Sequence, residues 1–148
     1  MNKQHCYARI TRWVNRLIAL LLVVLIFCLP ALLNWYIQVR TMTEAAKSAL
    51  TAAFYVCVGI IFIALWNVDC LLGSILLDEV FTRENVLRIR RICYCCGGVG
   101  LVCVPATVAY LPLIFLVIIM GFLCLTVSVV ANVMDAAVAI REENDLTI

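Results

Sequence analysis

One uncharged stretch limits the fold more than any other feature of the sequence. Residues 92–133 contain no Asp, Glu, Lys or Arg. A helix needs about 20 apolar residues to cross the roughly 30 Å hydrocarbon core of a bilayer. A stretch of 42 residues is therefore too long for one span and long enough for two. Pro112 is the better turn residue, and Pro105 is then expected inside the third helix. The stretch predicts a tight hairpin with spans at about 92–111 and 113–134.

Two earlier apolar runs predict another hairpin, with spans at about 17–36 and 49–77. The first run is longer than the roughly 7 to 15 residues of a secretory h-region, so we expect a retained transmembrane helix. The second run contains Asp69, which leaves two alternatives. Either the helix tilts and emerges from the membrane, or Asp69 marks the boundary and the residues after it lie along the interface.

The composition argues against a soluble domain. Hydrophobic residues make up 66% of the chain and charged residues only 14%, whereas soluble domains usually contain about 25% charged residues. Together with the four apolar runs, this composition predicts an all-α polytopic membrane protein. We expect a single domain over residues 1–148, with four transmembrane helices arranged as two hairpins and the lipid bilayer as its main contact.

The basic residues predict the orientation. Of the eleven Lys and Arg residues, Arg40 and Lys47 are the two that lie in the first connection. The others lie at the N-terminus, between the hairpins or near the C-terminus: Lys3, Arg9, Arg12, Arg16, Arg83, Arg88, Arg90, Arg91 and Arg141. Cytoplasmic segments carry the excess of Lys and Arg, so we expect both termini and residues 78–91 in the cytosol, and the protein in the inner (plasma) membrane. These residues flank the spans instead of forming one basic face, so direct nucleic-acid binding is not expected.

Four polar residues lie near the inner ends of the second and fourth spans: Asn67, Asp69, Asn132 and Asp135. An ionised carboxylate inside the bilayer costs on the order of a few kcal/mol unless it is paired, hydrated or protonated. Three alternatives stay open: boundary carboxylates paired with arginines, a proton or cation site formed with the two asparagines, or exposure to water. The arginines considered for pairing are Arg16, Arg88, Arg90 and Arg91.

The nine cysteines are expected to be free thiols that pack like small hydrophobic side chains. Cys93 and Cys96 have C-x-x-C spacing, but they enter an apolar span without a second ligand pair, which disfavours metal or redox chemistry. No catalytic triad, phosphate-binding glycine loop or paired-acid motif lies in a polar context. We therefore expect no enzyme activity, no metal and no cofactor.

Three glycines in the third span, Gly97, Gly98 and Gly100, are expected at close contacts between helices. Small residues let helix backbones approach in lipid, where the hydrophobic effect does not drive helices together. Close approach of this kind also permits a homo-oligomer.

The segment between the hairpins contains a helix start. Thr82 is suited to be the N-cap residue, and Glu84 then lies in the first turn, where a negative charge suits the helix dipole.

The same segment also carries a family resemblance. Phe-Thr-Arg-Glu-Asn at 81–85, followed by Leu87 and Arg88, and Glu-Glu-Asn-Asp-Leu-Thr-Ile at 142–148 are the residues concerned. They resemble a family of bacterial four-helix membrane proteins known only as a domain of unknown function. The resemblance extends over the arrangement of all four spans, although Val80 stands where a proline is expected. It implies a regulatory partner, because genes of this family commonly neighbour a small helix-turn-helix transcription regulator.

These observations lead to one main functional expectation and two alternatives. We expect an integral membrane accessory or regulatory protein that acts with a cytosolic partner, namely the DNA-binding regulator implied by the resemblance. The alternatives are a small ion-coupled transporter or permease that uses Asp69 and Asp135, and a structural subunit of a larger membrane complex. The polar groups suited to contact a partner, or one another, are Arg83, Glu84, Asn85, Arg88, Arg90, Arg91, Glu142, Glu143 and Asp145.

Overall fold

The computed structural model describes residues 2–39, 44–77 and 80–146, and within these ranges the regular structure is helical. The helices are α1 (Asn2–Val39), α2 (Glu44–Leu76), α3 (Arg83–Ala109) and α4 (Leu113–Leu146). Each contains a stretch long and apolar enough to cross a membrane. The predicted fold class, an all-α multi-pass membrane protein with four spans, is confirmed.

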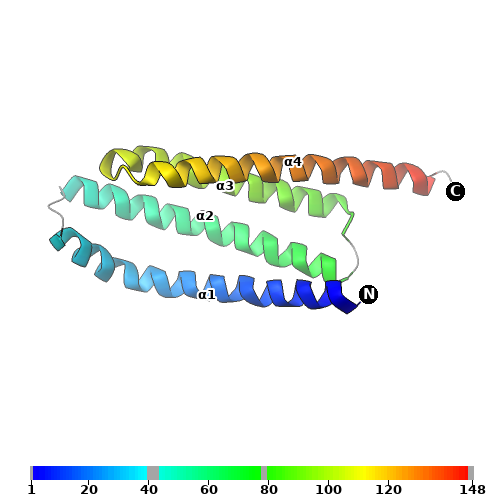
Figure 1. The fold of residues 1–148 in the computed structure, drawn as a ribbon, viewed down its shortest axis with the longest axis horizontal. Helices are drawn as coiled ribbons and strands as arrows, with labels where there is room; N and C mark the ends of the chain where they lie inside the picture. Colours follow the sequence, from blue (N-terminus) through cyan, green and yellow to red (C-terminus); the bar gives the residue numbers. More distant parts are fainter. Residues whose placement is uncertain (1, 40–43, 78–79, 147–148) are drawn as a thin grey trace.

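The helices alternate in direction, so their ends collect at two opposite ends of the molecule. Figure 1 shows the start of α1, the end of α2, the start of α3 and the end of α4 at one end. The turn between α3 and α4 lies at the other. Both termini therefore lie at the same end of the molecule, as the two predicted hairpins require.

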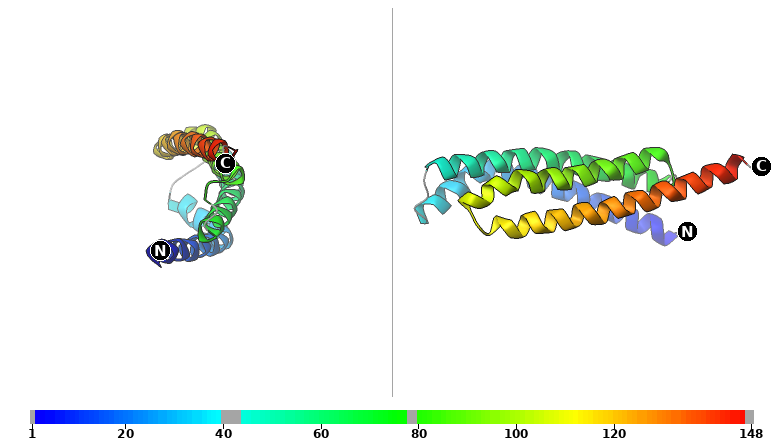
Figure 2. Two further views of the ribbon diagram at one scale, coloured as in Figure 1. Left: turned by 90° about the vertical axis from the view of Figure 1, so that its right-hand side faces the viewer. Right: turned by 90° about the horizontal axis from the view of Figure 1, so that it is seen from above.

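The four helices form an open arc instead of a closed bundle. Packing follows chain order, with α1 on α2, α2 on α3 and α3 on α4, and no other pair of the described helices packs together. Viewed along the helices, the ribbon is C-shaped, with α1 and α4 at its two tips (Figure 2). A soluble protein would close such an arc to bury apolar surface, but in lipid that driving force is absent.

The turn between α3 and α4 follows the sequence prediction. Tyr110 leaves the helix with extended dihedrals, φ −144° and ψ 97°, while its N–H still bonds to Ala106 O at 3.0 Å. Pro112, which has no N–H to donate, lies just before α4, and Pro105 lies inside α3.

The helices are longer than the predicted spans. α1 begins at Asn2, within the basic leader, and α4 continues through the charged tail to Leu146. α2 continues without a break past Asp69 to Leu76. Of the two alternatives for this segment, the unbroken helix matches the one in which α2 emerges from the membrane.

The predicted helix start at Thr82 is also confirmed. Its Oγ1 accepts a hydrogen bond from Asn85 N at 3.4 Å, and Glu84 lies in the first turn. Asn85 itself is completely buried, and its Nδ2 donates to Val80 O at 3.0 Å. The asparagine side chain thus holds the entering chain against the first turn of α3.

The glycines of α3 lie at helix contacts on both sides, as predicted. A Cβ at Gly97 would lie 3.4 Å from Cys124 Sγ of α4, and one at Gly100 would lie 3.5 Å from Met120 Cβ. A Cβ at Gly98 would lie 3.6 Å from Ile60 Cδ1 of α2. The absence of side chains at these positions therefore lets α3 pack closely between its two neighbours.

We predict that Asn85→Ala lowers the free energy of unfolding by about 1–3 kcal/mol, because it leaves buried hydrogen-bonding groups at the start of α3 unsatisfied. Thermal or SDS-induced unfolding in detergent micelles would measure the loss. Asn132→Ala is the matched control: Asn132 is exposed, so this change should stay within about 0.5 kcal/mol. Equal effects of the two variants would contradict the structural role of Asn85.

Candidate functional site

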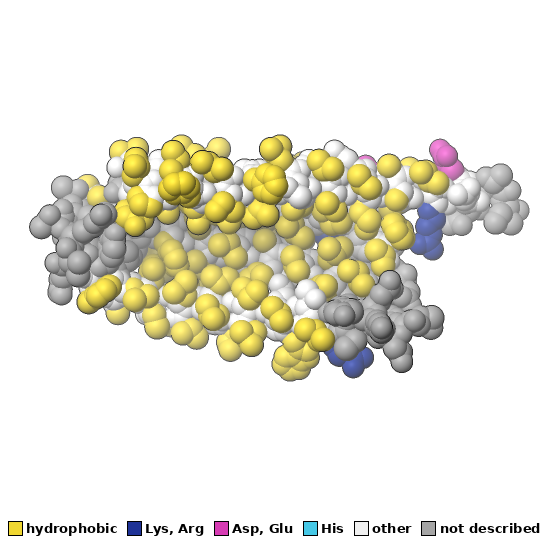
Figure 3. Space-filling model, in the orientation of Figure 1, with side chains coloured by type: hydrophobic (Ala, Val, Ile, Leu, Met, Phe, Trp, Pro, Cys, Tyr) yellow, Lys and Arg dark blue, Asp and Glu magenta, His cyan; other side chains and the backbone are white. Residues whose placement is uncertain are grey.

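Charged side chains gather at the end of the arc that holds both termini. On the face shown in Figure 3, acidic and basic side chains appear toward this end, and hydrophobic side chains cover most of the remaining length. We call this region the charged end. Its described charged residues are Arg9, Arg12, Arg16, Asp69, Arg83, Glu84, Arg88, Arg90, Arg91, Asp135, Arg141, Glu142 and Glu143.

Asp69 of α2 is held by two arginines of α1. Arg12 Nε and Nη2 donate to the two carboxylate oxygens at 3.2 and 3.1 Å. Arg16 Nε lies 3.6 Å from Oδ1. Such a two-pronged guanidinium–carboxylate pair is among the stronger ion-pair geometries. The two arginines are one helical turn apart, so both reach the same carboxylate.

Asp135 of α4 has an equivalent environment in the second hairpin. Arg83 Nη1 lies 3.0 Å from Oδ1, and Arg90 Nη2 lies 3.3 Å from Oδ2. Arg83 also donates to both carboxylate oxygens of Glu142, at 3.2 and 3.0 Å. In each hairpin, therefore, the first helix supplies two arginines to one aspartate on the second helix.

The structure does not bring the four predicted polar residues together into one site. α2, which carries Asn67 and Asp69, does not pack against α4, which carries Asn132 and Asp135. Asn67 is buried and donates to Ile63 O of its own helix at 2.7 Å, whereas Asn132 is exposed. Of the three alternatives, the geometry matches paired boundary carboxylates.

The sequence predicts only part of this pairing. Of the four arginines predicted to pair, Arg16 and Arg90 each contact an aspartate, whereas Arg88 and Arg91 form no ion pair with Asp69 or Asp135. Arg12 and Arg83, which make the shorter contacts, are not among the predicted partners. The four-residue spacing of Arg12 and Arg16 places both on one helix face, and this spacing indicates in the sequence that both can reach one carboxylate.

Arg88 joins the two hairpins. Its Nη1 donates to Ser74 Oγ at 2.9 Å and lies 3.4 Å from Cys70 O, both in the last turns of α2. The same nitrogen donates to Asn85 Oδ1 at 3.1 Å, and Nη2 pairs with Glu84 at 2.7 Å. A cation also suits the negative end of the α2 dipole. Arg88 is one of the residues predicted to contact a partner or one another; in the structure it pairs with Glu84 of that set and fastens α2 to α3.

The remaining residues that are predicted to contact a partner differ in how far they are exposed and paired. Arg91 and Glu143 are exposed, and the side chain of Asp145 lies outside the described residues. Arg91 and Arg141 form no ion pair with another described residue. The charged end therefore keeps exposed basic groups after its internal pairs have formed.

An open groove of about 380 Å³ at this end is lined in part by Arg141. We call it the end groove; its lining residues are Phe81, Ala137, Ile140, Arg141 and Asn144. Phe81 is 46% exposed and Ile140 is 61% exposed. This groove was not predicted from the sequence. The sequence feature that indicates it is the spacing of residues 137, 140, 141 and 144, which places four of the five lining residues on one face of α4.

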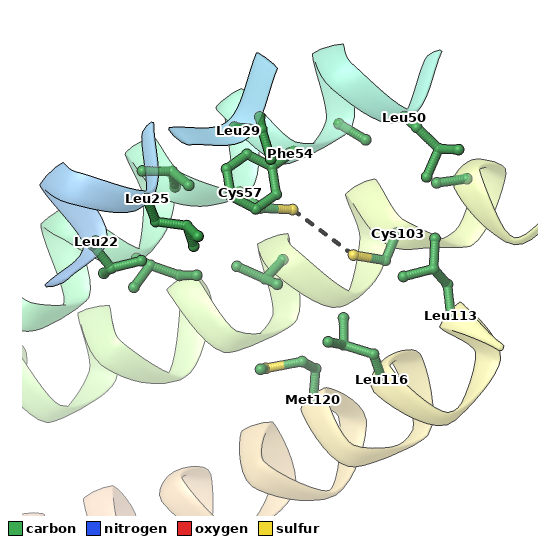
Figure 4. A pocket seen from close by; sticks show the side chains of 15 residues that line it. Leu22, Leu25, Leu29, Leu50, Phe54, Cys57, Cys103, Leu113, Leu116 and Met120 are labelled. Carbon is green, nitrogen blue, oxygen red and sulfur yellow. Dashed lines mark hydrogen bonds between the residues drawn. The ribbon is translucent and has the colours of Figure 1, made fainter. Parts of the chain in front are cut away.

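A second cavity, of about 330 Å³, lies where the helices curve around their concave side. Residues from all four helices line it, including Leu29, Phe54, Cys103 and Leu116 (Figure 4). Its lining is entirely apolar apart from thiols. Cys57 and Cys103 meet there with their Sγ atoms 3.7 Å apart. A lining of this kind suits hydrocarbon.

The thiols lie at contacts between helices. Besides the Cys57–Cys103 contact, Cys93 Sγ of α3 lies 3.5 Å from Cys124 Sγ of α4 and donates to Cys124 O. All eight cysteines whose side chains are described are free. Among the described residues, no group of three or more His, Cys, Asp or Glu side chains is arranged to hold a metal ion.

Comparison with known proteins places the chain in a family. The family described as protein of unknown function (DUF2975) matches residues 38–148, which is well over half of the chain. The chain belongs to this family. The match begins at Gln38, so the resemblance that was expected over all four spans is shown for α2, α3 and α4. No curated protein and no solved structure matches the chain.

We predict that Asp69→Asn destabilises the protein by about 1–3 kcal/mol, because it removes a carboxylate that accepts two hydrogen bonds from one arginine. Glu84→Gln is the control, since Glu84 pairs with Arg88 on an exposed helix surface, where such pairs contribute about 0.5 kcal/mol or less. Thermal unfolding in detergent would compare them. The double variant with Arg12→Gln should lose less stability than the two single variants summed; simple additivity would contradict the pairing.

Proposed function

We propose that this protein is an accessory protein of the bacterial inner membrane that acts with a cytosolic partner. The partner implied by the family resemblance is a helix-turn-helix DNA-binding regulator. The observation that carries this proposal is the charged end, which combines an open groove with exposed basic side chains beside both termini.

The charge distribution supports a cytosolic location for this end. Its described residues include eight arginines, whereas Lys47 is the one basic side chain described near the opposite end. Cytoplasmic segments carry the excess of Lys and Arg. In this orientation the end groove faces the compartment in which a DNA-binding regulator works.

The end groove has the composition of a partner surface. Aromatic residues and arginines are enriched at the energetic centres of protein interfaces, and Phe81 and Arg141 are of these kinds. Ile140, which lines the same groove, adds exposed apolar surface. α4 also extends furthest at this end of the molecule, which carries its charged last turns beyond the neighbouring helices (Figure 2).

The internal ion pairs change which charges a partner would meet. Arg83, Glu84, Arg88 and Arg90, which are predicted to contact a partner or one another, are engaged within the chain. Arg91 and Arg141 have no described acidic partner. A regulator that presents acidic residues around an apolar contact would therefore complement this surface.

The ion-coupled transporter receives less support from the same geometry. A coupling site needs a carboxylate that can exchange a proton or cation along a polar path. Asp69 and Asp135 each contact two arginines at the charged end, and they lie on helices that do not pack together. The cavity on the concave side of the arc is apolar.

Co-purification would test the proposal. Tagged protein solubilised from its own membranes should retain a helix-turn-helix regulator of the kind that the family resemblance implies. The double variant Phe81→Ala and Ile140→Ala should reduce the retained regulator about tenfold, which corresponds to a loss of about 1.4 kcal/mol in binding. Ile119→Ala is the matched control, because Ile119 is equally exposed but lies within the apolar part of α4. Failure of the wild-type protein to retain the regulator, or equal retention by both variants, would contradict the proposal.

A further inference from the structure

A third cavity, of about 240 Å³, lies between α1 and α2 at the charged end. Its lining changes character along its length. Arg16, Trp66 and Asp69 form the part nearest the charged end. Ala19 and Phe62 lie about one or two turns closer to the middle of the helices, since α1 runs away from the charged end and α2 runs toward it. The cavity is therefore polar at one end and apolar at the other.

The arginines around this cavity exceed the acidic groups. Arg12 donates to both oxygens of Asp69 at 3.2 and 3.1 Å, whereas Arg16 lies farther from that carboxylate, with its Nε 3.6 Å from Oδ1. The Arg16 side chain is 61% exposed, and it forms no ion pair with a described residue other than Asp69. Arg9, two turns earlier on the same helix face, adds another exposed cation. Among the described residues, the positive charge of this part of the charged end exceeds the negative charge of Asp69.

Two exposed tryptophans place the cavity at the membrane surface. Trp13 is 70% exposed and Trp66 is 74% exposed. Exposed tryptophans in membrane proteins concentrate at the level of the lipid headgroups. Arg9, Trp13 and Arg16 follow one another at helical spacing and are all exposed, so they form one exposed stripe on α1. The polar part of the cavity thus lies at headgroup depth, and the apolar part lies at the depth of the acyl chains.

We propose that this cavity binds one anionic phospholipid. The phosphate contacts the terminal nitrogens of Arg16 and the indole N–H of Trp66, and an acyl chain runs along Ala19 and Phe62. Guanidinium groups bind phosphate oxygens in pairs, and basic pockets between transmembrane helices are suited to acidic headgroups. This inference does not depend on the proposed partner, because the cavity lies between α1 and α2 and the end groove lies against α4.

Native mass spectrometry of the full chain in detergent would test the site, with phosphatidylglycerol, phosphatidylcholine and glycerol 3-phosphate as probes. The wild-type protein should bind one phosphatidylglycerol at least tenfold more tightly than phosphatidylcholine. Arg16→Gln should weaken that binding at least fivefold, and Arg91→Gln should not change it. Arg91 is the matched control, because it is an exposed arginine of the charged end on a helix that does not pack against α1.

Two more variants distinguish a lipid site from a site for free phosphate or a diffuse attraction to anions. Ala19→Phe fills the apolar part, so it should weaken phosphatidylglycerol binding without changing the response to glycerol 3-phosphate. Arg16→Lys keeps the charge and the pairing with Asp69, so it tests the site if Arg16→Gln does not fold. If both variants fold, Arg16→Lys should lose less affinity for phosphatidylglycerol than Arg16→Gln. If Arg16→Gln is unfolded, the affinity of Arg16→Lys should remain within fivefold of wild type. Equal loss in Arg16→Gln and Arg91→Gln would show diffuse attraction and overturn the proposal. Glycerol 3-phosphate displacing the lipid at equal concentration would also overturn it.

Discussion

Each hairpin carries one aspartate near the point where its second helix leaves the apolar region, and each aspartate is held by two arginines from the first helix. An unpaired carboxylate next to a membrane-spanning segment is costly if it enters the bilayer. The pairing therefore does two things at once. It makes the charge tolerable, and it ties the two helices of a hairpin together at the end where no short turn connects them. The charged end depends on this arrangement.

The open arc arises because contacts form only between described helices that are neighbours in the chain. Polar contacts join neighbouring helices at the charged end. Farther along, the glycines of α3 let it pack closely against α2 and α4. α1 and α4 have no comparable contact with each other. In water, the apolar faces left by such an arc would drive closure or aggregation, whereas in a bilayer lipid can cover them. The arc leaves the end groove, the apolar cavity and the α1–α2 cavity open to occupants from the membrane or the cytosol.

The sequence predicts the parts of this structure that depend on local signals. Span number and approximate position follow from the length of apolar runs, the turn follows from Pro112, and the start of α3 follows from the capping ability of Thr82. The pairing of side chains between helices depends on helix rotation and offset, which no local pattern specifies. For this reason the sequence does not predict Arg12 as the main partner of Asp69, or that Arg88 fastens α2 to α3.

We propose that the charged end as a whole faces the cytosol. Labelling with a membrane-impermeant maleimide tests it most directly, in a variant whose native cysteines are replaced and single cysteines are introduced by Arg91→Cys, Glu143→Cys and Leu111→Cys. Leu111 is exposed in the turn between α3 and α4 at the opposite end. The account predicts that the first two cysteines react in inverted membrane vesicles and not in intact cells, and that the third reacts in intact cells. Labelling of Arg91→Cys or Glu143→Cys from outside intact cells would contradict it.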